Sequence, residues 1–219
     1  SHCLLSRFIK GGFMIIPNKL NKGDIIGVVA PSNPIVGENI DEIMNAKKIV
    51  ENDGFRVEFS KNIFSNSNLY SAAAKEKAYD INSMFANKDI KMIWCAKGGE
   101  NSNSTFDYLD FDLIKNNPKI ICGYSDITSL TNIITEKTGL VTFSGTNFKT
   151  IATDNTNYSY NQAINRFVNG SLSLGLENEE YKTLKYNTLW LPPNVLPTTL
   201  HTHQFFLTVK SFLVFINHS

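Results

Sequence analysis

The chain has 219 residues, of which 42% are hydrophobic and 19% are charged, and its formal net charge is +1. This composition is ordinary for a globular protein, and so small a charge gives no electrostatic basis for binding nucleic acid or an anionic membrane. The apolar run at 205–216 is interrupted by Lys210 and is too short to span a bilayer. Three cysteines are too few for a disulfide framework and favour a reducing, cytoplasmic location.

Residues 1–13 do not fit the pattern that begins at Met14. They lack the apolar core and the small-residue cleavage site of a signal peptide. Lys10, Gly11 and Gly12 stand shortly before Met14, as a translated purine-rich ribosome-binding site would place them. We therefore expect residues 1–13 to be a non-native leader.

From Met14 onward, segments with the apolar patterns of strands and helices alternate. The continuous apolar run at 24–30 predicts a strand buried on both faces, followed by a proline-rich loop at 31–34. Further strands are expected at 55–59, 90–96, 120–122 and 140–143, and helices at 39–52, 72–86, 106–116, 127–137 and 160–168. This alternation predicts an α/β domain with a parallel sheet over residues 14–170.

The apolar residues of the expected helices predict which side of each helix faces the sheet. In helix 39–52 the predicted inward residues are Ile40, Ile43, Met44 and Val50. In helix 72–86 they are Ala74, Ala78, Ile81 and Phe85.

The stretch 119–137 carries the strongest local signal for chemistry. An apolar run, a sharp turn at 123–126 and an amphipathic helix form the pattern of a nucleophile elbow, with Ser125 at its apex. The first amide groups of such a helix are unpaired, and together with the helix dipole they can stabilise an oxyanion. However, Ile127 stands where the full motif has a second glycine, and Ser125 and Asp126 are also ordinary N-cap residues. The local pattern therefore leaves both a nucleophile and a helix cap open.

A second polar segment, 97–103, follows the strand expected at 90–96. Gly98 and Gly99 at the end of that strand let the backbone approach a ligand closely. Open α/β sheets bind ligands outside the carboxyl ends of their strands, where residues 144–147 are also expected. A plain tight turn is the alternative interpretation of the glycine pair.

Four blocks of sequence, taken in order, resemble the LD-carboxypeptidase family of serine peptidases. They are VVAPSNP at 28–34, CAKGGENSN at 95–103, YLDFDLIKNNPKIICGYSDITSL at 108–130 and KTGLVTFSG at 137–145. Within the family, the Asn-Ser-Asn after the glycine pair and the TGLVTFSG run are most similar to the microcin C self-immunity peptidase branch. Thr146 and Asn147 stand where that branch has Pro-His.

The resemblance implies a Rossmann-like or flavodoxin-like N-terminal domain that bears the nucleophile, and a separate C-terminal domain. It implies that Ser125 is the nucleophile and that the backbone N–H groups of Asp126 and Gly99 form the oxyanion hole. The residues that it assigns to the substrate cleft are Gly98, Ser32, Asn101 and Ser144. The implied substrates are L,D-linked muropeptides of peptidoglycan or microcin-like aminoacyl-nucleotide amides, hydrolysed in the bacterial cytoplasm without a metal or cofactor. Homodimers are expected among intact relatives.

Family members complete a Ser-His-Glu triad from their C-terminal domain, and neither the Glu motif nor the His motif is recognisable in residues 171–219. No acidic residue follows Glu180 and no glycine follows Gly175, so we expect 171–219 to be a linker and a degenerate or out-of-frame tail. His201 and His203 lack a neighbouring carboxylate and are expected to be neither base nor metal ligand. Loss of a triad base costs roughly 10⁶ in kcat by comparison with subtilisin, so little or no peptidase activity is expected. A divergent native tail and a non-catalytic ligand-binding remnant are the alternatives.

Overall fold

A computed structural model describes residues 14–67, 70–170 and 212–213. The strands are β1 (Ile25–Val29), β2 (Arg56–Phe59), β3 (Ile90–Cys95), β4 (Ile120–Gly123), β5 (Phe143–Ser144) and β6 (Phe212–Leu213). The helices are α1 (Glu38–Asn52), α2 (Ala74–Ala86), the 3₁₀ helix η1 (Ser102–Tyr108), α3 (Phe111–Asn116), α4 (Ile127–Thr138), α5 (Thr150–Thr153) and α6 (Tyr158–Asn169). The predicted leader at 1–13 and, apart from β6, the predicted tail at 171–219 lie outside the described residues.

The strands form one parallel sheet in the order β2-β1-β3-β4-β5-β6. The first five strands have the order of a flavodoxin-like sheet, so the predicted α/β class and parallel sheet are confirmed. All five residues of β1 are buried, which agrees with the continuous apolar run from which this strand was predicted.

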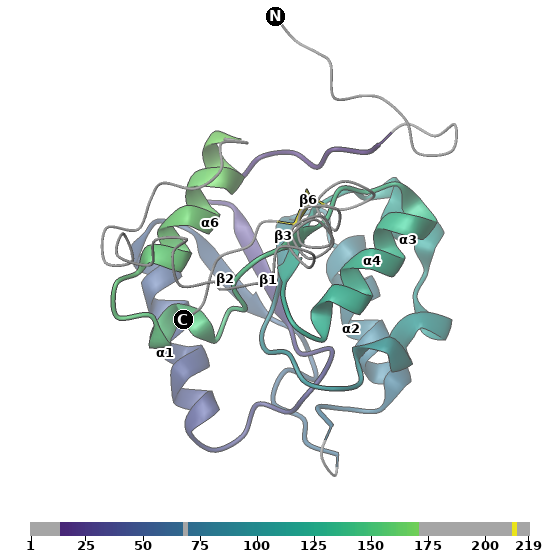
Figure 1. Cartoon of the computed structure of the whole chain (residues 1–219), viewed down its shortest axis with the longest axis horizontal. Coiled ribbons are helices and arrows are strands. Elements are labelled where there is room, and N and C mark those ends of the chain that lie inside the picture. The colour runs from purple at the N-terminus through teal and green to yellow at the C-terminus, as the bar shows by residue number, and fades with distance from the viewer. Residues whose placement is uncertain (1–13, 68–69, 171–211, 214–219) are drawn as a thin grey trace, which may run out of the picture.

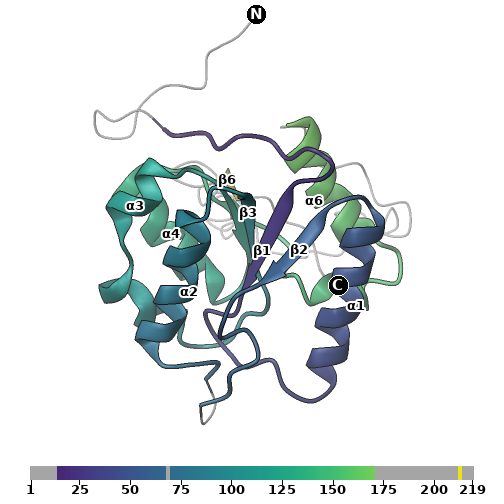
Figure 2. The ribbon, with the colours of Figure 1, turned by 180° about the vertical axis from the view of Figure 1, so that it is seen from behind.

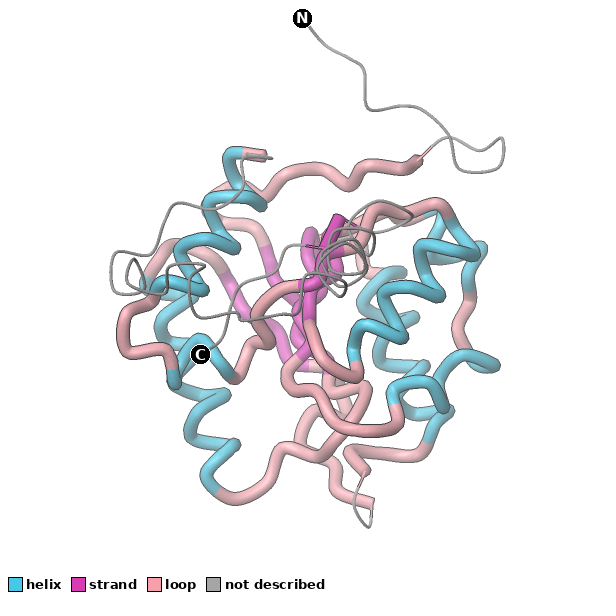
Figure 3. The backbone as a smooth tube through the Cα atoms, in the orientation of Figure 1, coloured by secondary structure: helices cyan, strands magenta, loops and turns pink. Residues whose placement is uncertain are grey.

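Helices cover both faces of the sheet (Figure 1, Figure 2). Helices α1, α5 and α6 lie on one side of the strands, and α2, α3 and α4 lie on the other, as the tube drawing also shows (Figure 3). On the first side, the Trp94 ring of β3 lies 5.8 Å from Phe148, 6.4 Å from Tyr160 and 6.1 Å from Phe167, measured between ring centroids. No helix among the described residues is long and apolar enough to cross a membrane.

The segment expected to be one helix at 106–116 consists of two shorter elements. The 3₁₀ helix η1 ends at Tyr108, Leu109 is extended, and α3 begins at Phe111. The break follows from Asp110, whose side chain accepts a hydrogen bond from the Leu113 amide at 2.8 Å and so caps α3. Helix α5 was not predicted, because four residues are too few to show a helical period.

The structure also differs from the predictions for one strand and for the inward side of one helix. Strand β5 is shorter than the predicted 140–143, because Leu140 pairs with Ile15 of the N-terminal segment outside the sheet. In α1, Ile40 and Met44 are 40% and 39% exposed, so they do not belong to the inward side predicted for them. The core side of α1 is instead formed by Ile43, Ala46 and Val50.

Lys119, just before β4, makes the stability of the domain depend on pH. Its buried ammonium group donates to the carbonyls of Met84 and Asn87 at the end of α2. Burial, helped by the charge of Lys91 and opposed by Asp89, lowers the pKa of Lys119 from 10.5 to about 8. Above pH 8 the folded chain has released this proton, whereas the unfolded chain holds it up to about pH 10.5. The contribution of Lys119 to stability therefore grows as the pH rises through this window.

We expect the free energy of unfolding of the wild-type chain, relative to Lys119→Met, to rise by at most about 1.4 kcal/mol per pH unit between these two pKa values. Urea unfolding of both proteins across the window measures this difference, and other titrating groups cancel between them. A difference that stays constant or falls with pH would contradict the prediction.

Candidate active site

The loops that carry the predicted site residues meet at one edge of the sheet. Because the strands are parallel, the loops after β1, β3, β4 and β5 all leave from the carboxyl edge. Strand order reverses between β1 and β3, and this switch point is where open α/β sheets leave a crevice for ligands. The loops at 30–37 and 96–101 flank that point, and the turn at 124–126 lies one strand further on.

Ser125 lies at the apex of the turn between β4 and α4. Its side chain is exposed, and its backbone has a φ of 65°. A residue with a Cβ loses about 1–2 kcal/mol in this left-handed conformation, so the turn stores strain at this position. The turn is closed by the Thr128 amide, which donates to the Ser125 carbonyl at 2.9 Å. The hydroxyl therefore stands at the end of a strained strand-to-helix turn, as the elbow pattern predicted.

The glycine pair lies directly against this serine. A Cβ added at Gly98 would be 3.1 Å from the Ser125 Cβ and 3.3 Å from its Oγ. A Cβ at Gly99 would be 2.2 Å from the Asn33 Oδ1 and 2.4 Å from the Ser32 Oγ. The loops after β1, β3 and β4 thus approach one another so closely that position 99 has no room for a side chain and position 98 has little.

Two backbone amides beside Ser125 are available to a ligand. Within the described part of the chain, the N–H groups of Gly99 and Asp126 donate no hydrogen bond. Asp126 directly precedes α4, so its amide also belongs to the positive end of that helix dipole. Pairs of unpaired amides beside a nucleophile are the usual donors to an oxyanion.

The side chain of Asp126 points away from the solvent and joins three loops. Its Oδ2 accepts from the Ser32 hydroxyl at 2.5 Å and from the Ser102 amide at 2.7 Å. Its backbone carbonyl accepts from the hydroxyls of Ser102 and Ser129, both at 2.8 Å. Ser32 is fully buried, so it supports the elbow from beneath and its hydroxyl is occupied.

A buried lysine that the sequence patterns did not single out lies beside this network. Lys77 of α2 is only 2% exposed, and its Nζ donates to the Asn101 carbonyl at 3.1 Å and to the Asn101 Oδ1 at 3.0 Å. Burial lowers the pKa of Lys77, and the charge of Asp126 opposes this shift. One signal was present in the sequence: Lys77 precedes the inward Ile81 by four residues, so it shares that side of the helix.

The loop after β5 supports the elbow from the other side. The Asn147 Oδ1 accepts from the Tyr124 amide at 3.1 Å, directly before the serine. The Thr146 carbonyl accepts from the Trp94 indole at 2.6 Å, deep in the core. Ser144 pairs with Gly123 across the two strands and is buried. The residues that replace the expected Pro-His therefore hold the backbone at the base of the turn.

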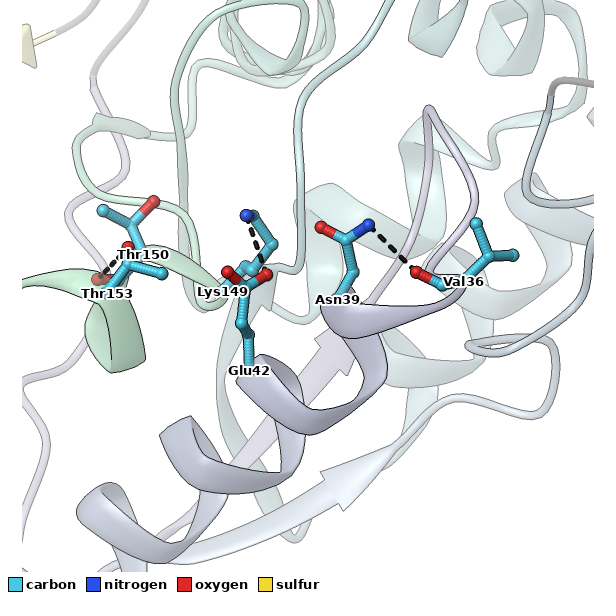
Figure 4. A network of polar contacts seen from close by, with 6 residues as sticks. All are labelled: Val36, Asn39, Glu42, Lys149, Thr150 and Thr153. Atoms are coloured by element: carbon cyan, nitrogen blue, oxygen red, sulfur yellow. Dashed lines mark hydrogen bonds and ion pairs between the residues drawn. The ribbon is translucent and has the colours of Figure 1, made fainter.

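An ion pair fastens the same loop to α1. The Lys149 Nζ lies 2.9 Å from the Glu42 Oε2, and both side chains are partly exposed (Figure 4). The Lys149 amide also donates to the Ala96 carbonyl at the end of β3, at 3.0 Å. Exposed pairs of this kind contribute about 0.2–1 kcal/mol, so this contact orients the loop more than it stabilises the fold.

Ser125, Gly98, Gly99 and Asp126 come together, with Ser32 beneath them, whereas Asn101 is bound to Lys77 at the side. Among the described residues there is no cluster of His, Cys, Asp or Glu that could hold a metal ion. All histidines of the sequence lie outside the described residues: His2, His201, His203 and His218. The structure therefore describes an exposed serine hydroxyl beside the glycine loop, and no histidine lies among the described residues.

A sequence profile of the LD-carboxypeptidase N-terminal domain matches residues 26–145, which is more than half of the chain and includes the whole elbow. The chain belongs to the LD-carboxypeptidase family. It is 37% identical over 129 residues to the "Probable murein peptide carboxypeptidase" of Bacillus subtilis, a match covering 59% of this chain and 40% of that protein. It is 38% identical over 123 residues to the microcin C7 self-immunity protein MccF of Escherichia coli, covering 56% of this chain and 36% of that one.

The fold is shared with a solved structure of MccF in complex with aspartyl sulfamoyl adenosine. The TM-score is 0.67 and the identity 32%, covering 70% of this chain and 47% of that chain. The resemblance to carboxypeptidases and to the self-immunity protein, predicted from the four sequence blocks, is thus confirmed. This chain spans about two fifths of the length of its sequence relatives.

Proposed function

We propose that Ser125 is the nucleophile of a serine-type LD-carboxypeptidase site, with the amides of Gly99 and Asp126 as its oxyanion hole. The observation that carries this proposal is the exposed serine held at a φ of 65° beside two amides that donate no hydrogen bond among the described residues. Strained backbone at an exposed polar residue is typical of functional sites. Helix capping does not account for the strain at Ser125, because the N-cap of α4 is Asp126. The family membership supports the same assignment.

The proposed reaction is acyl transfer. The Ser125 Oγ attacks an amide carbonyl carbon, and the carbonyl oxygen, now negative, is stabilised by the two amides. Collapse of this intermediate breaks the C–N bond, the amine leaves with a proton, and water then hydrolyses the serine ester to a carboxylate. A base must accept the hydroxyl proton of Ser125, and the family takes a histidine for this step from its C-terminal domain. We therefore propose that this chain on its own turns over slowly.

We propose two substrate classes for the site: peptides with an L,D linkage, as in murein, and aminoacyl-nucleotide amides. The name of the Bacillus subtilis relative supports the first. The second is supported by the complex of MccF with aspartyl sulfamoyl adenosine. Both classes present an amide next to a carboxylate-bearing residue, so the same hydroxyl and amides would serve either. The buried, unpaired Cys95 and Cys122 agree with the cytoplasmic location proposed for this reaction.

The test uses the full chain with two probes. A fluorophosphonate, which reacts with nucleophilic serines, is expected to give one adduct that peptide mass spectrometry places on Ser125, and this adduct should form slowly because the proposed site lacks its base. Aspartyl sulfamoyl adenosine is expected to bind at one site by calorimetry, with release of aspartate at least about 10³-fold slower than an intact relative assayed beside it. An adduct on another residue, or no adduct at all, would contradict the assignment of Ser125. Release of aspartate at the rate of the relative would contradict only the proposed slow hydrolysis. Binding of aspartyl sulfamoyl adenosine without any fluorophosphonate adduct would favour a non-catalytic binding site.

A further inference from the structure

The loop at 96–101, which carries Gly98 and Gly99, has no regular structure of its own. Its place beside Ser125 must therefore be set by contacts from outside. Two charged side chains make these contacts at the far end of the loop. Lys77 binds Asn101 through both the carbonyl and the Oδ1, and the Asp126 carboxylate accepts from the amide of the next residue, Ser102.

Burying a charged side chain costs free energy unless hydrogen bonds or other polar contacts compensate the charge. Lys77 is 2% exposed among the buried residues of α2, which are otherwise apolar except for Asp80, and a Met there would bury the same stem without desolvating an ammonium group. The ammonium group is compensated by two hydrogen bonds to Asn101 and by the ring of Tyr70, whose centroid lies 5.9 Å away. The Oδ2 atom of the Asp126 carboxylate accepts from one hydroxyl and one amide.

The two contacts act on two adjacent residues from different elements. Lys77 belongs to α2, Asp126 precedes α4, and both helices lie on the same side of the sheet (Figure 1). Asn101 and Ser102 are adjacent in sequence and follow Gly99 by two and three residues. Fixing them holds the end of the loop beyond Gly99, while the Asn33 amide, which donates to the Gly98 carbonyl at 3.4 Å, holds the peptide that carries the Gly99 N–H.

We propose that Lys77 and Asp126 are positioning residues that clamp the loop at 96–101 onto the elbow and thereby hold the Gly99 amide beside Ser125. The clamp itself is a property of the fold. Its effect on reactivity rests on the proposed function, because only a nucleophilic Ser125 makes the place of that amide matter.

The first experiment measures amide hydrogen exchange of the full chain, which needs no reactivity. In Lys77→Met and Asp126→Ala, exchange of the Ser102 amide within 96–102 is expected to become about tenfold faster, the effect of losing a buried hydrogen bond, while the sheet is unchanged. Asp126→Asn keeps an oxygen acceptor for the Ser102 amide and should recover most of the protection. Lys75→Met and Asp107→Asn replace exposed residues of the same types nearby and should exchange as the wild type does.

The second experiment measures the rate of Ser125 labelling by the fluorophosphonate in the same variants. A displaced oxyanion donor is expected to slow labelling at least about tenfold in Lys77→Met and Asp126→Ala, with partial recovery in Asp126→Asn. If Lys77→Met does not fold, Asn101→Ala removes one of the two acceptors of Lys77 without touching the core. It should show the same local change at smaller size.

The two readouts separate the clamp from the proposed function. Unchanged exchange at 96–102 in the Lys77 and Asp126 variants would overturn the clamp, whatever the labelling shows. Faster exchange throughout α2 and the sheet would also overturn it, because Lys77 would then be a general structural residue. An unlabelled wild-type chain with locally accelerated exchange in the variants would support the clamp and refute the nucleophile.

Discussion

Ser125→Gly is expected to abolish the fluorophosphonate adduct and, in the same protein, to raise the free energy of unfolding by about 1 kcal/mol. The loss of the adduct follows from removing the only atom proposed to react. The gain in stability follows from the φ of 65°, which costs a residue with a Cβ free energy that glycine does not lose. Part of this gain is offset because glycine has more conformational freedom in the unfolded chain. Labelling followed by mass spectrometry and urea unfolding measure the two effects.

Two variants separate reactivity from strain. Ser125→Ala also removes the hydroxyl but keeps the Cβ, so it should lose the adduct and stay within about 0.5 kcal/mol of the wild-type stability. Asn157→Gly relieves the other described non-glycine residue with positive φ, 53°, at the start of α6. It should gain some stability and keep normal labelling. Equal stabilities of Ser125→Gly and Ser125→Ala would show that the turn stores no strain, and an adduct that persists in either would show that another residue reacts.

The sheet and the elbow could be predicted because each of their elements is specified by its own residues. The continuous apolar run of β1 is typical of a strand buried on both faces. The turn at Ser125 is bounded by a strand and a helix whose apolar periods differ, so its place in the chain is defined within a residue or two. The local pattern left a nucleophile and a helix cap open for Ser125, and the family resemblance favoured the nucleophile.

The network behind the elbow could not be predicted, because its partners are far apart in the sequence. The Ser32 hydroxyl reaches Asp126 across 94 positions, and Lys77 reaches Asn101 across 24. Both contacts form only after strand order has placed the loops side by side. A lysine in a helix is exposed in most proteins, so a buried position was not expected for Lys77. Asn147 was missed for the same reason, because its bond to the Tyr124 amide joins two loops.

Gly99→Ala is expected to slow labelling of Ser125 by at least about 10²-fold and to lower the free energy of unfolding by about 2 kcal/mol. A methyl group at this position would lie 2.2 Å from the Asn33 Oδ1 and 2.4 Å from the Ser32 Oγ, closer than any contact allows. Asn33 is partly exposed and can turn away, but Ser32 is fully buried and its hydroxyl is bound to Asp126. The loop at 96–101 must therefore move outward, and the Gly99 amide moves with it.

Gly37→Ala is the matched control for this variant. Gly37 precedes α1 with a φ of 57°, and a Cβ there would meet nothing within 4 Å. Its ψ of −134° lies in a region nearly restricted to glycine. The variant therefore tests backbone strain without a collision, and should cost about 1–3 kcal/mol of stability with unchanged labelling. Urea unfolding and the labelling rate of both variants give the comparison. If Gly99→Ala were to behave like Gly37→Ala, the loop would tolerate a side chain and the Gly99 amide could not be a donor fixed by close packing. If Gly99→Ala lowered the free energy of unfolding while Ser125 was still labelled at the wild-type rate, the Asp126 amide would stabilise the oxyanion without Gly99.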